Sequence, residues 1–221
     1  MLERILPPSA SVKATREDLD TELFPEEEAL VGQAVEKRRR EFTTARACAR
    51  EALARLGQPP RPILSGPKGE PLWPPGVVGS ITHCDGYRAC AVAPVSELIT
   101  IGIDAEPNLP LPDGLLGDIA LHEERELLRD LAQRAPGTHW DRLLFSIKES
   151  IYKAWFPLAE RWLGFEDAVV AIDWERQSFA ARVLVPGPVI DGRELRSFHG
   201  SWLAVDGLVM AAIALPADRA E

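Results

Sequence analysis

Residues 144–155, with the sequence LFSIKESIYKAW, restrict the fold more than any other stretch of the chain. At about 100° per residue, a helix places the polar side chains of this stretch on one side and the apolar ones on the other. The polar stripe consists of Ser146, Glu149, Ser150 and Lys153, and the apolar face consists of Ile147, Ile151, Ala154 and Trp155. The stretch therefore predicts an amphipathic helix that packs on a core.

Glu149 and Lys153 lie four residues apart on the polar stripe, with the acid nearer the N-terminus. That is the favoured order for an ion pair on an exposed helix, and such pairs are common. Two observations favour a functional site instead. Phe145 and Phe156 border the stripe, which indicates that it is partly covered, and a second acidic cluster, GIDAE, precedes it at residues 102–106.

Length, charge and cysteine content limit the class of protein. With 221 residues, 46% of them hydrophobic, the chain can form one large domain or two small ones. Its formal net charge of −9 argues against a nucleic-acid partner. Three cysteines, Cys48, Cys84 and Cys90, lack metal-site spacing and indicate reduced thiols. No signal peptide and no spanning apolar run are apparent, so we expect a cytoplasmic protein without a membrane partner.

Turn signals and periodicity predict the remaining elements. A helical segment is expected over residues 25–57, with a break near Lys37 or Arg40 and an end at Gly57. Asp85-Gly86 and Asp206-Gly207 are both typical of hairpin turns. Strands are expected over 87–93, 98–103 and 208–216, a strand pair over 168–185, and a polar helix over 121–134.

The two hairpins, and the helical stretches around Phe42 and Phe145, resemble each other in sequence. This internal repeat predicts an α+β fold of two similar halves, each a helix followed by antiparallel strands, related by a pseudo-twofold axis. We place the N-terminal half at residues 1–105 and the C-terminal half at 106–221, together forming one globular unit. Two halves in one chain favour a monomer.

Asp104 and Glu106 are separated by one residue at the end of an expected strand, so their side chains point to the same side. Together with Glu149 they offer three carboxylates, with no suitable His or Cys nearby. Such oxygen ligands suit a hard divalent ion, Mg²⁺ above all, which shares its shell with substrate phosphates. The alternative is that the acids merely end a strand in solvent.

Cations and hydroxyl groups elsewhere in the chain suit phosphate binding. They comprise Thr82, His83, Lys68, Arg46 and the basic run at residues 37–40. An isolated histidine beside a turn and a charged run on a helix are more often ordinary surface features. Here a phosphate-binding role is favoured only because the rest of the chain is acidic. The sequence contains no Walker loop, GxSxG elbow or G-x-G-x-x-G motif. Phosphates would therefore be held by side chains and metal.

Three ordered blocks of the sequence resemble one known family. GSITHCDGYRACAVA, GIDAE and FSIKESIYKAW are similar to the signature blocks of the Sfp/EntD-type phosphopantetheinyl transferases, most of all the actinobacterial PptT-like members. The basic KRRREF helix, GPKGEPLWP and RWLGFEDA extend the resemblance over roughly residues 35–170. The family implies two similar α+β halves. It also implies transfer of the 4′-phosphopantetheine arm of coenzyme A to a serine of an apo acyl or peptidyl carrier protein of polyketide, fatty acid or nonribosomal peptide synthases, releasing adenosine 3′,5′-bisphosphate.

The resemblance also implies roles for individual residues. Asp104, Glu106 and Glu149 match the Mg²⁺ ligands, with Mn²⁺ as an alternative ion. Lys153 matches the lysine near the transferred phosphate, and Glu149, or a water it orients, matches the base toward the serine. Contacts to coenzyme A are implied for Arg38, Arg46, Lys68, Thr82, His83, Lys148 and Lys153. One departure is SITH where many members have a second serine, which affects one hydroxyl.

Two other functions remain compatible with the residues alone. A Mg²⁺-dependent phosphohydrolase that cleaves a nucleotide pyrophosphate would share the carboxylates but need no protein acceptor. A module that binds coenzyme A without catalysis would tolerate the change Glu149→Gln.

Overall fold

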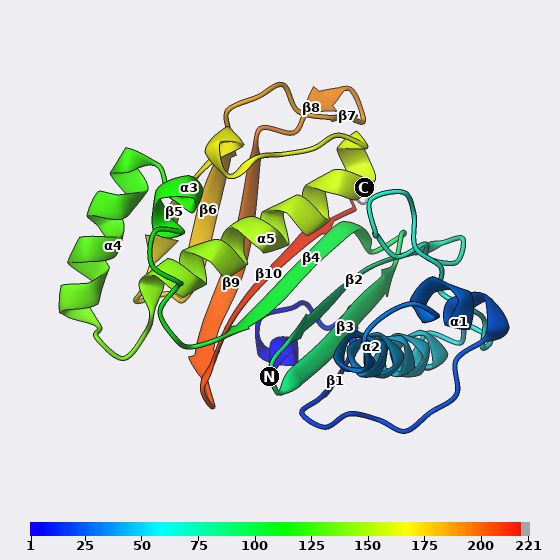
Figure 1. The fold of residues 1–221 in the computed structure, drawn as a ribbon. Helices are drawn as coiled ribbons and strands as arrows, with labels where there is room; N and C mark the ends of the chain where they lie inside the picture. The colour runs from blue at the N-terminus through cyan, green and yellow to red at the C-terminus, as the bar shows by residue number, and fades with distance from the viewer. Residues whose placement is uncertain (218–221) are drawn as a thin grey trace.

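The computed structural model describes residues 1–217, so the last four residues of the expected C-terminal half, 218–221, lie outside the described residues. Two antiparallel sheets lie side by side, and a long helix lies across each (Figure 1). The N-terminal sheet carries α2 (Glu36–Arg55), and the C-terminal sheet carries α5 (Trp140–Ala159). This arrangement confirms the expected α+β class, while the pseudo-twofold relation between the halves stays a prediction.

The N-terminal sheet has the strand order β1-β3-β2. Its strands are β1 (Ser11–Thr15), β2 (Val77–Cys84) and β3 (Tyr87–Pro94). β2 and β3 form the hairpin expected at Asp85-Gly86, where Gly86 takes a φ of 68° that a side chain would oppose. The face toward α2 is apolar, with Cys48, Ala52 and Ile63 fully buried against it. The short helix α1 (Pro25–Val31) precedes α2.

The C-terminal sheet has the strand order β4-β10-β9-β6-β5. Its strands are β4 (Leu98–Pro107), β5 (Ala168–Asp173), β6 (Ser178–Val183), β9 (Ser197–Val205) and β10 (Leu208–Pro216). The apolar side of α5, including Ile147, Ile151 and Trp155, packs on this sheet as the sequence predicts. The remaining elements are η1 (Leu2–Arg4), α3 (Leu116–Ile119), α4 (His122–Arg134), η2 (Phe165–Asp167), β7 (Val189–Ile190) and β8 (Arg193–Glu194).

The two sheets meet where β2 runs beside β4 (Figure 1). Hydroxyl groups of β2 join them: the backbone N–H of Ile103 donates to Ser80 Oγ (3.1 Å), and that of Ala105 donates to Thr82 Oγ1 (3.1 Å). These side-chain bonds satisfy backbone donors on the edge of β4 that β10 does not reach. They fix β4 between β2 and β10.

Helix α5 approaches β4 closely at Gly102. A Cβ atom at this position would lie 2.0 Å from the carbonyl oxygen of Ser150 and 2.8 Å from the backbone nitrogen of Ala154. Thr100, two residues earlier on the same face, donates from Oγ1 to the carbonyl of Ala154 (2.9 Å). The glycine of GIDAE therefore allows the helix to lie against the strand that carries Asp104.

Most expected elements are confirmed, and the differences are local. The break in the first helical segment falls at residues 32–35, before Lys37, and α5 is longer than residues 144–155 at both ends. β4 continues to Pro107, and its backbone pairing is with β10. β4, which the expected N-terminal half (residues 1–105) includes, thus belongs to the C-terminal sheet, and the division into halves at residue 105 stays a prediction. No helix among residues 1–217 is long and apolar enough to span a membrane.

Candidate active site

A cavity of about 850 Å³ opens between α2, the loop at residues 65–73, β2 and the C-terminal part of α5. Six of the predicted site residues line it: Arg38, Arg46, Lys68, His83, Glu149 and Lys153. The lining also includes Glu70 and Glu160 and an apolar and aromatic wall formed by Phe42, Leu72, Trp73, Tyr152, Phe156 and Trp162. Cations beside an aromatic wall suit a ligand with several phosphates and an uncharged arm.

Lys153 connects the cavity to the GIDAE strand. Its Nζ donates to Asp104 Oδ1 (2.7 Å) and to the carbonyl oxygen of Ile103 (3.2 Å). Thr82 Oγ1 also donates to Asp104 Oδ1 (3.2 Å), and Asp104 is only 4% exposed. Asp104 Oδ2 is buried and has no hydrogen-bond partner among residues 1–217. A buried, unpaired carboxylate oxygen is costly, so this atom is suited to bind an added cation.

Glu106 lies on the same side of β4 as Asp104, as the strand alternation predicts. Its Oε2 accepts a hydrogen bond from Arg142 Nη1 of α5 (3.1 Å). Burial raises the pKa of Glu106 to about 7; the Asp104 carboxylate adds to this rise, and Arg142 opposes it. Glu106 therefore forms an ion pair with Arg142 in a partly desolvated environment.

Glu149 lines the cavity one helical turn before Lys153. Burial raises the pKa of Glu149, Lys153 opposes the rise and Asp104 adds to it. Within the described chain, no group of three or more His, Cys, Asp or Glu side chains is arranged to hold a metal ion. The assignment of Asp104, Glu106 and Glu149 as metal ligands therefore stays a prediction, and in this structure Lys153 and Arg142 engage two of the three carboxylates.

The same residues nevertheless suit a divalent cation. The free Oδ2 of Asp104 is an unused oxygen ligand, and burial raises the pKa values of Glu106 and Glu149, so a bound cation would favour their charged forms. Asp104 and Glu106 contact residues of α5, Glu149 lies on α5 itself, and carboxylates are the ligands that Mg²⁺ favours. To bind a metal ion here, Glu106 would either leave Arg142 or contact Arg142 with one carboxylate oxygen and the ion with the other.

The predicted phosphate-binding cations are placed by α2 and the following loop. Arg46 donates from Nε to the carbonyl of Ile63 (2.8 Å) and from Nη2 to Ser65 Oγ (3.1 Å), and its guanidinium lies over the Phe42 ring. Burial lowers the pKa of Arg46 to about 10, which leaves it charged at neutral pH. Lys68 is exposed at the cavity margin. These positions suit a bound anion.

Lys148 and Thr82 do not fit their predicted contacts with coenzyme A. The side chain of Lys148 is 2% exposed, and its ammonium pairs with Glu124 Oε2 (2.7 Å) and donates to the carbonyl groups of Ile119, Phe165 and Ala168. Four oxygens thus surround three hydrogens, so Lys148 has no donor left for a ligand. Thr82 is 1% exposed, and its hydroxyl is used within the contact between the two sheets.

Sequence reasoning missed Arg142, Tyr152 and Trp162. Tyr152 follows Glu149 by three residues, so helical spacing could have placed it beside the polar stripe. Its ring lies 4.9 Å from that of Trp162, which is 71% exposed. An isolated arginine such as Arg142 carried no local signal, because its partner Glu106 is 36 residues away.

Comparison with known proteins supports the resemblance over most of the chain. The family model described as the 4′-phosphopantetheinyl transferase N-terminal domain matches residues 26–93, and that of the 4′-phosphopantetheinyl transferase superfamily matches residues 100–211. The chain is 57% identical to the 4′-phosphopantetheinyl transferase Svp of Streptomyces mobaraensis, over 90% of this chain and 82% of that protein.

Two further relatives are similar over comparable lengths. Identity is 50% to the 4′-phosphopantetheinyl transferase Npt of Nocardia iowensis, over 97% of this chain and 99% of that one. It is 48% to the 4′-phosphopantetheinyl transferase PptT of Mycobacterium tuberculosis, over 87% and 86%. The chain belongs to the 4′-phosphopantetheinyl transferase family.

Proposed function

We propose that this protein transfers the 4′-phosphopantetheine arm of coenzyme A to a serine of an apo acyl or peptidyl carrier protein, releasing adenosine 3′,5′-bisphosphate. The observation that carries the proposal is the set of side chains that line one cavity. Four cations, Arg38, Arg46, Lys68 and Lys153, line it together with Glu149 and an aromatic wall. The cations suit the phosphates of coenzyme A, and the aromatic wall suits its uncharged arm.

Transfer of a phosphoryl group depends mainly on position and on neutralising the charge of the transferring group. Lys153 lies at the base of the cavity, where its ammonium can neutralise charge on the attacked phosphate. Asp104, Glu106 and Glu149 would hold Mg²⁺ or Mn²⁺. When bound, the ion would add positive charge beside the pyrophosphate.

Glu149 is our candidate for the base that accepts the serine proton, directly or through a water that it orients. A serine hydroxyl is a weak nucleophile at neutral pH, and a carboxylate with a raised pKa accepts a proton more readily. A carboxylate that also binds a metal is a weaker base. Protein-held water beside Glu149 would relieve that conflict.

The direct test incubates the protein with coenzyme A, Mg²⁺ and an apo carrier protein, and follows the intact mass of the carrier. We expect the mass of one phosphopantetheine group to be added, and no addition when a chelator removes the metal. Breakdown of coenzyme A without any acceptor would instead favour the phosphohydrolase. Binding of coenzyme A without either reaction would favour a non-catalytic binding module.

We also propose that the protein acts as a monomer in the cytoplasm. The cytoplasmic placement is supported by its cysteines, since Cys48, Cys84 and Cys90 are free and buried. Size-exclusion chromatography with light scattering tests the monomer.

A further inference from the structure

The side chains of Arg38 and His83 are in direct contact inside the cavity. Arg38 Nη1 lies 2.8 Å from His83 Nε2. A guanidinium has donors only, so Nε2 of the imidazole must accept this bond. The ring is then neutral, with its single proton on Nδ1. Both residues line the cavity, and a ligand phosphate near them would compete with Nε2 for the arginine.

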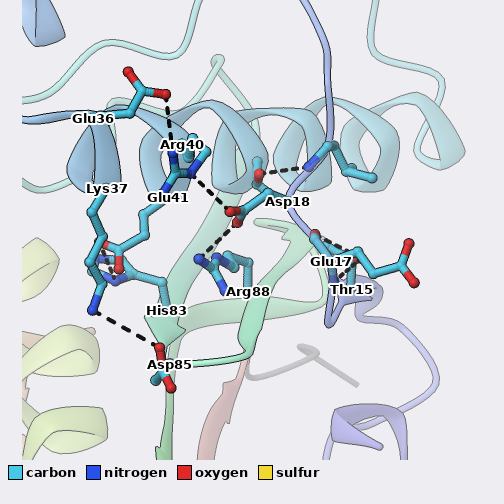
Figure 2. Close-up of polar contacts among 12 residues, drawn as sticks. Thr15, Glu17, Asp18, Glu36, Lys37, Arg40, Glu41, His83, Asp85 and Arg88 are labelled. Carbon is cyan, nitrogen blue, oxygen red and sulfur yellow. Dashed lines mark hydrogen bonds and ion pairs between the residues drawn. The ribbon is translucent and has the colours of Figure 1, made fainter.

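Glu41 lies on the other side of the imidazole, behind the cavity wall. Its Oε2 is 3.7 Å from His83 Nδ1, and its side chain is 12% exposed (Figure 2). Arg38 and Glu41 come from adjacent turns of α2, so one helix presents a cation to Nε2 and an anion to Nδ1. The carboxylate favours a proton on Nδ1, and it would also stabilise a doubly protonated ring.

The other charges around His83 are mainly positive. Arg88 faces it from β3 and Lys153 from α5, while Lys37 of α2 pairs at 4.0 Å with Asp85 in the β2–β3 turn (Figure 2). Burial lowers the pKa of His83; Arg38 lowers it further, Glu41 opposes this, and Lys153 and Arg88 add to the lowering. The ring therefore stays neutral at pH 7 in the free protein.

We propose that Glu41 is a positioning residue for His83, and that coenzyme A binding charges this histidine. In the free protein Glu41 keeps the ring proton on Nδ1. When a phosphate of coenzyme A binds Arg38, Nε2 is released, takes one proton from solvent and donates to the same phosphate. The positive ring then lies between two anions, the phosphate and Glu41. The inference rests on the proposed function, because it takes coenzyme A as the ligand.

The direction of proton exchange distinguishes charging of His83 from titration of the ligand phosphate. A phosphate monoester has a second pKa of about 6, and a cationic site favours its dianion, so the ligand itself releases protons on binding. Histidine charging takes protons up. A net count alone would mix the two, so the ring must be observed directly.

The experiment records the ring nitrogens by long-range ¹H–¹⁵N NMR at pH 7, with and without coenzyme A and without added metal. The chain has four histidines, so the spectrum is simple, and His83→Gln identifies the signal. We expect a neutral ring with the proton on Nδ1 in the free protein and a doubly protonated ring in the complex. A neutral His83 in the coenzyme A complex would overturn the inference while leaving the proposed function intact.

Two variants test whether Glu41 positions His83. Glu41→Gln should leave the ring neutral in the complex and weaken coenzyme A binding about 5- to 10-fold at pH 7, since one pKa unit corresponds to tenfold in protonation. The matched control is Glu36→Gln, because Glu36 lies on the same helix but pairs with Arg40 at the surface (Figure 2). If the His83 ring of Glu41→Gln becomes doubly protonated in the coenzyme A complex as it does in wild type, Glu41 does not position His83. If coenzyme A fails to bind wild type at all, the proposed function fails as well.

Discussion

The ammonium of Lys153 lies 2.7 Å from Oδ1 of Asp104, and this ion pair joins helix α5 to strand β4. Asp104 is almost fully buried, whereas the side chain of Lys153 is 26% exposed toward the cavity. The pair thus links two blocks of sequence that are 49 residues apart. It places the lysine at the base of the cavity and the acid beneath it.

Removing only the lysine should destabilise the protein. Lys153→Met leaves Asp104 buried without its counter-ion, and we expect the free energy of unfolding to fall by about 3 kcal/mol. Adding Asp104→Asn should restore most of that loss, because the uncompensated charge is gone. Urea denaturation of both variants tests this. Equal stability of Lys153→Met and wild type would show that the ion pair contributes nothing.

Lys148 should prove structural. Lys148→Met leaves Glu124 charged in a site that is 1% exposed, so we expect a loss of about 3–5 kcal/mol in the free energy of unfolding. The affinity of the remaining folded protein for coenzyme A should equal that of wild type, as measured by calorimetry below the unfolding transition. A selective loss of affinity would return Lys148 to the binding site.

Gly102 should not tolerate a side chain. Gly102→Ala forces a Cβ into the backbone of α5, and overpacking of this kind costs about 1–3 kcal/mol. Displacement of α5 from β4 should also lower the transfer rate, since Glu149 and Lys153 move with the helix. Gly117→Ala is the matched control, because a Cβ there meets no atom within 4 Å. Similar behaviour of the two variants in thermal melts and transfer assays would contradict the close approach.

Docking of the carrier protein should depend on salt. Carrier proteins are acidic and this chain has a net charge of −9, so we expect contact through a local basic surface near the cavity, weakened as salt screens it. Lys37 is 67% exposed beside Arg38, and Lys37→Glu should weaken binding of the apo carrier measured without coenzyme A. Arg129→Glu, on α4 at the opposite side of the molecule, should not (Figure 1). Salt-independent affinity would rule out electrostatic docking.

Local patterns predicted the elements well, because their signals are local. Both hairpins follow from Asp-Gly turns between apolar runs, and α5 follows from its amphipathic spacing. The cavity residues Glu149 and Lys153 were found from the same spacing. Gly102 also lies in a block that the sequence singled out, although its packing role required the position of α5.

The errors concern contacts between residues that are distant in sequence, and neighbouring residues whose side chains point to different sides of a helix or strand. Arg142 contacts Glu106 and Lys148 contacts Glu124 only after the chain has folded. Lys148 is one residue before Glu149, about 100° away around the helix, so it could not share the polar stripe. Thr82 and His83 are likewise neighbours on a strand and face opposite sides, and of the two only His83 lines the cavity.

The most direct test of the account is the rate of phosphopantetheine transfer by Glu149→Gln, measured from the mass of an apo carrier protein with saturating coenzyme A and Mg²⁺. We expect the rate to fall roughly 10²- to 10⁴-fold, while thermal unfolding is unchanged. Glu123→Gln, an exposed change on α4, should transfer like wild type. A folded Glu149→Gln protein with a rate within tenfold of wild type would contradict the assignment of this cavity as the active site.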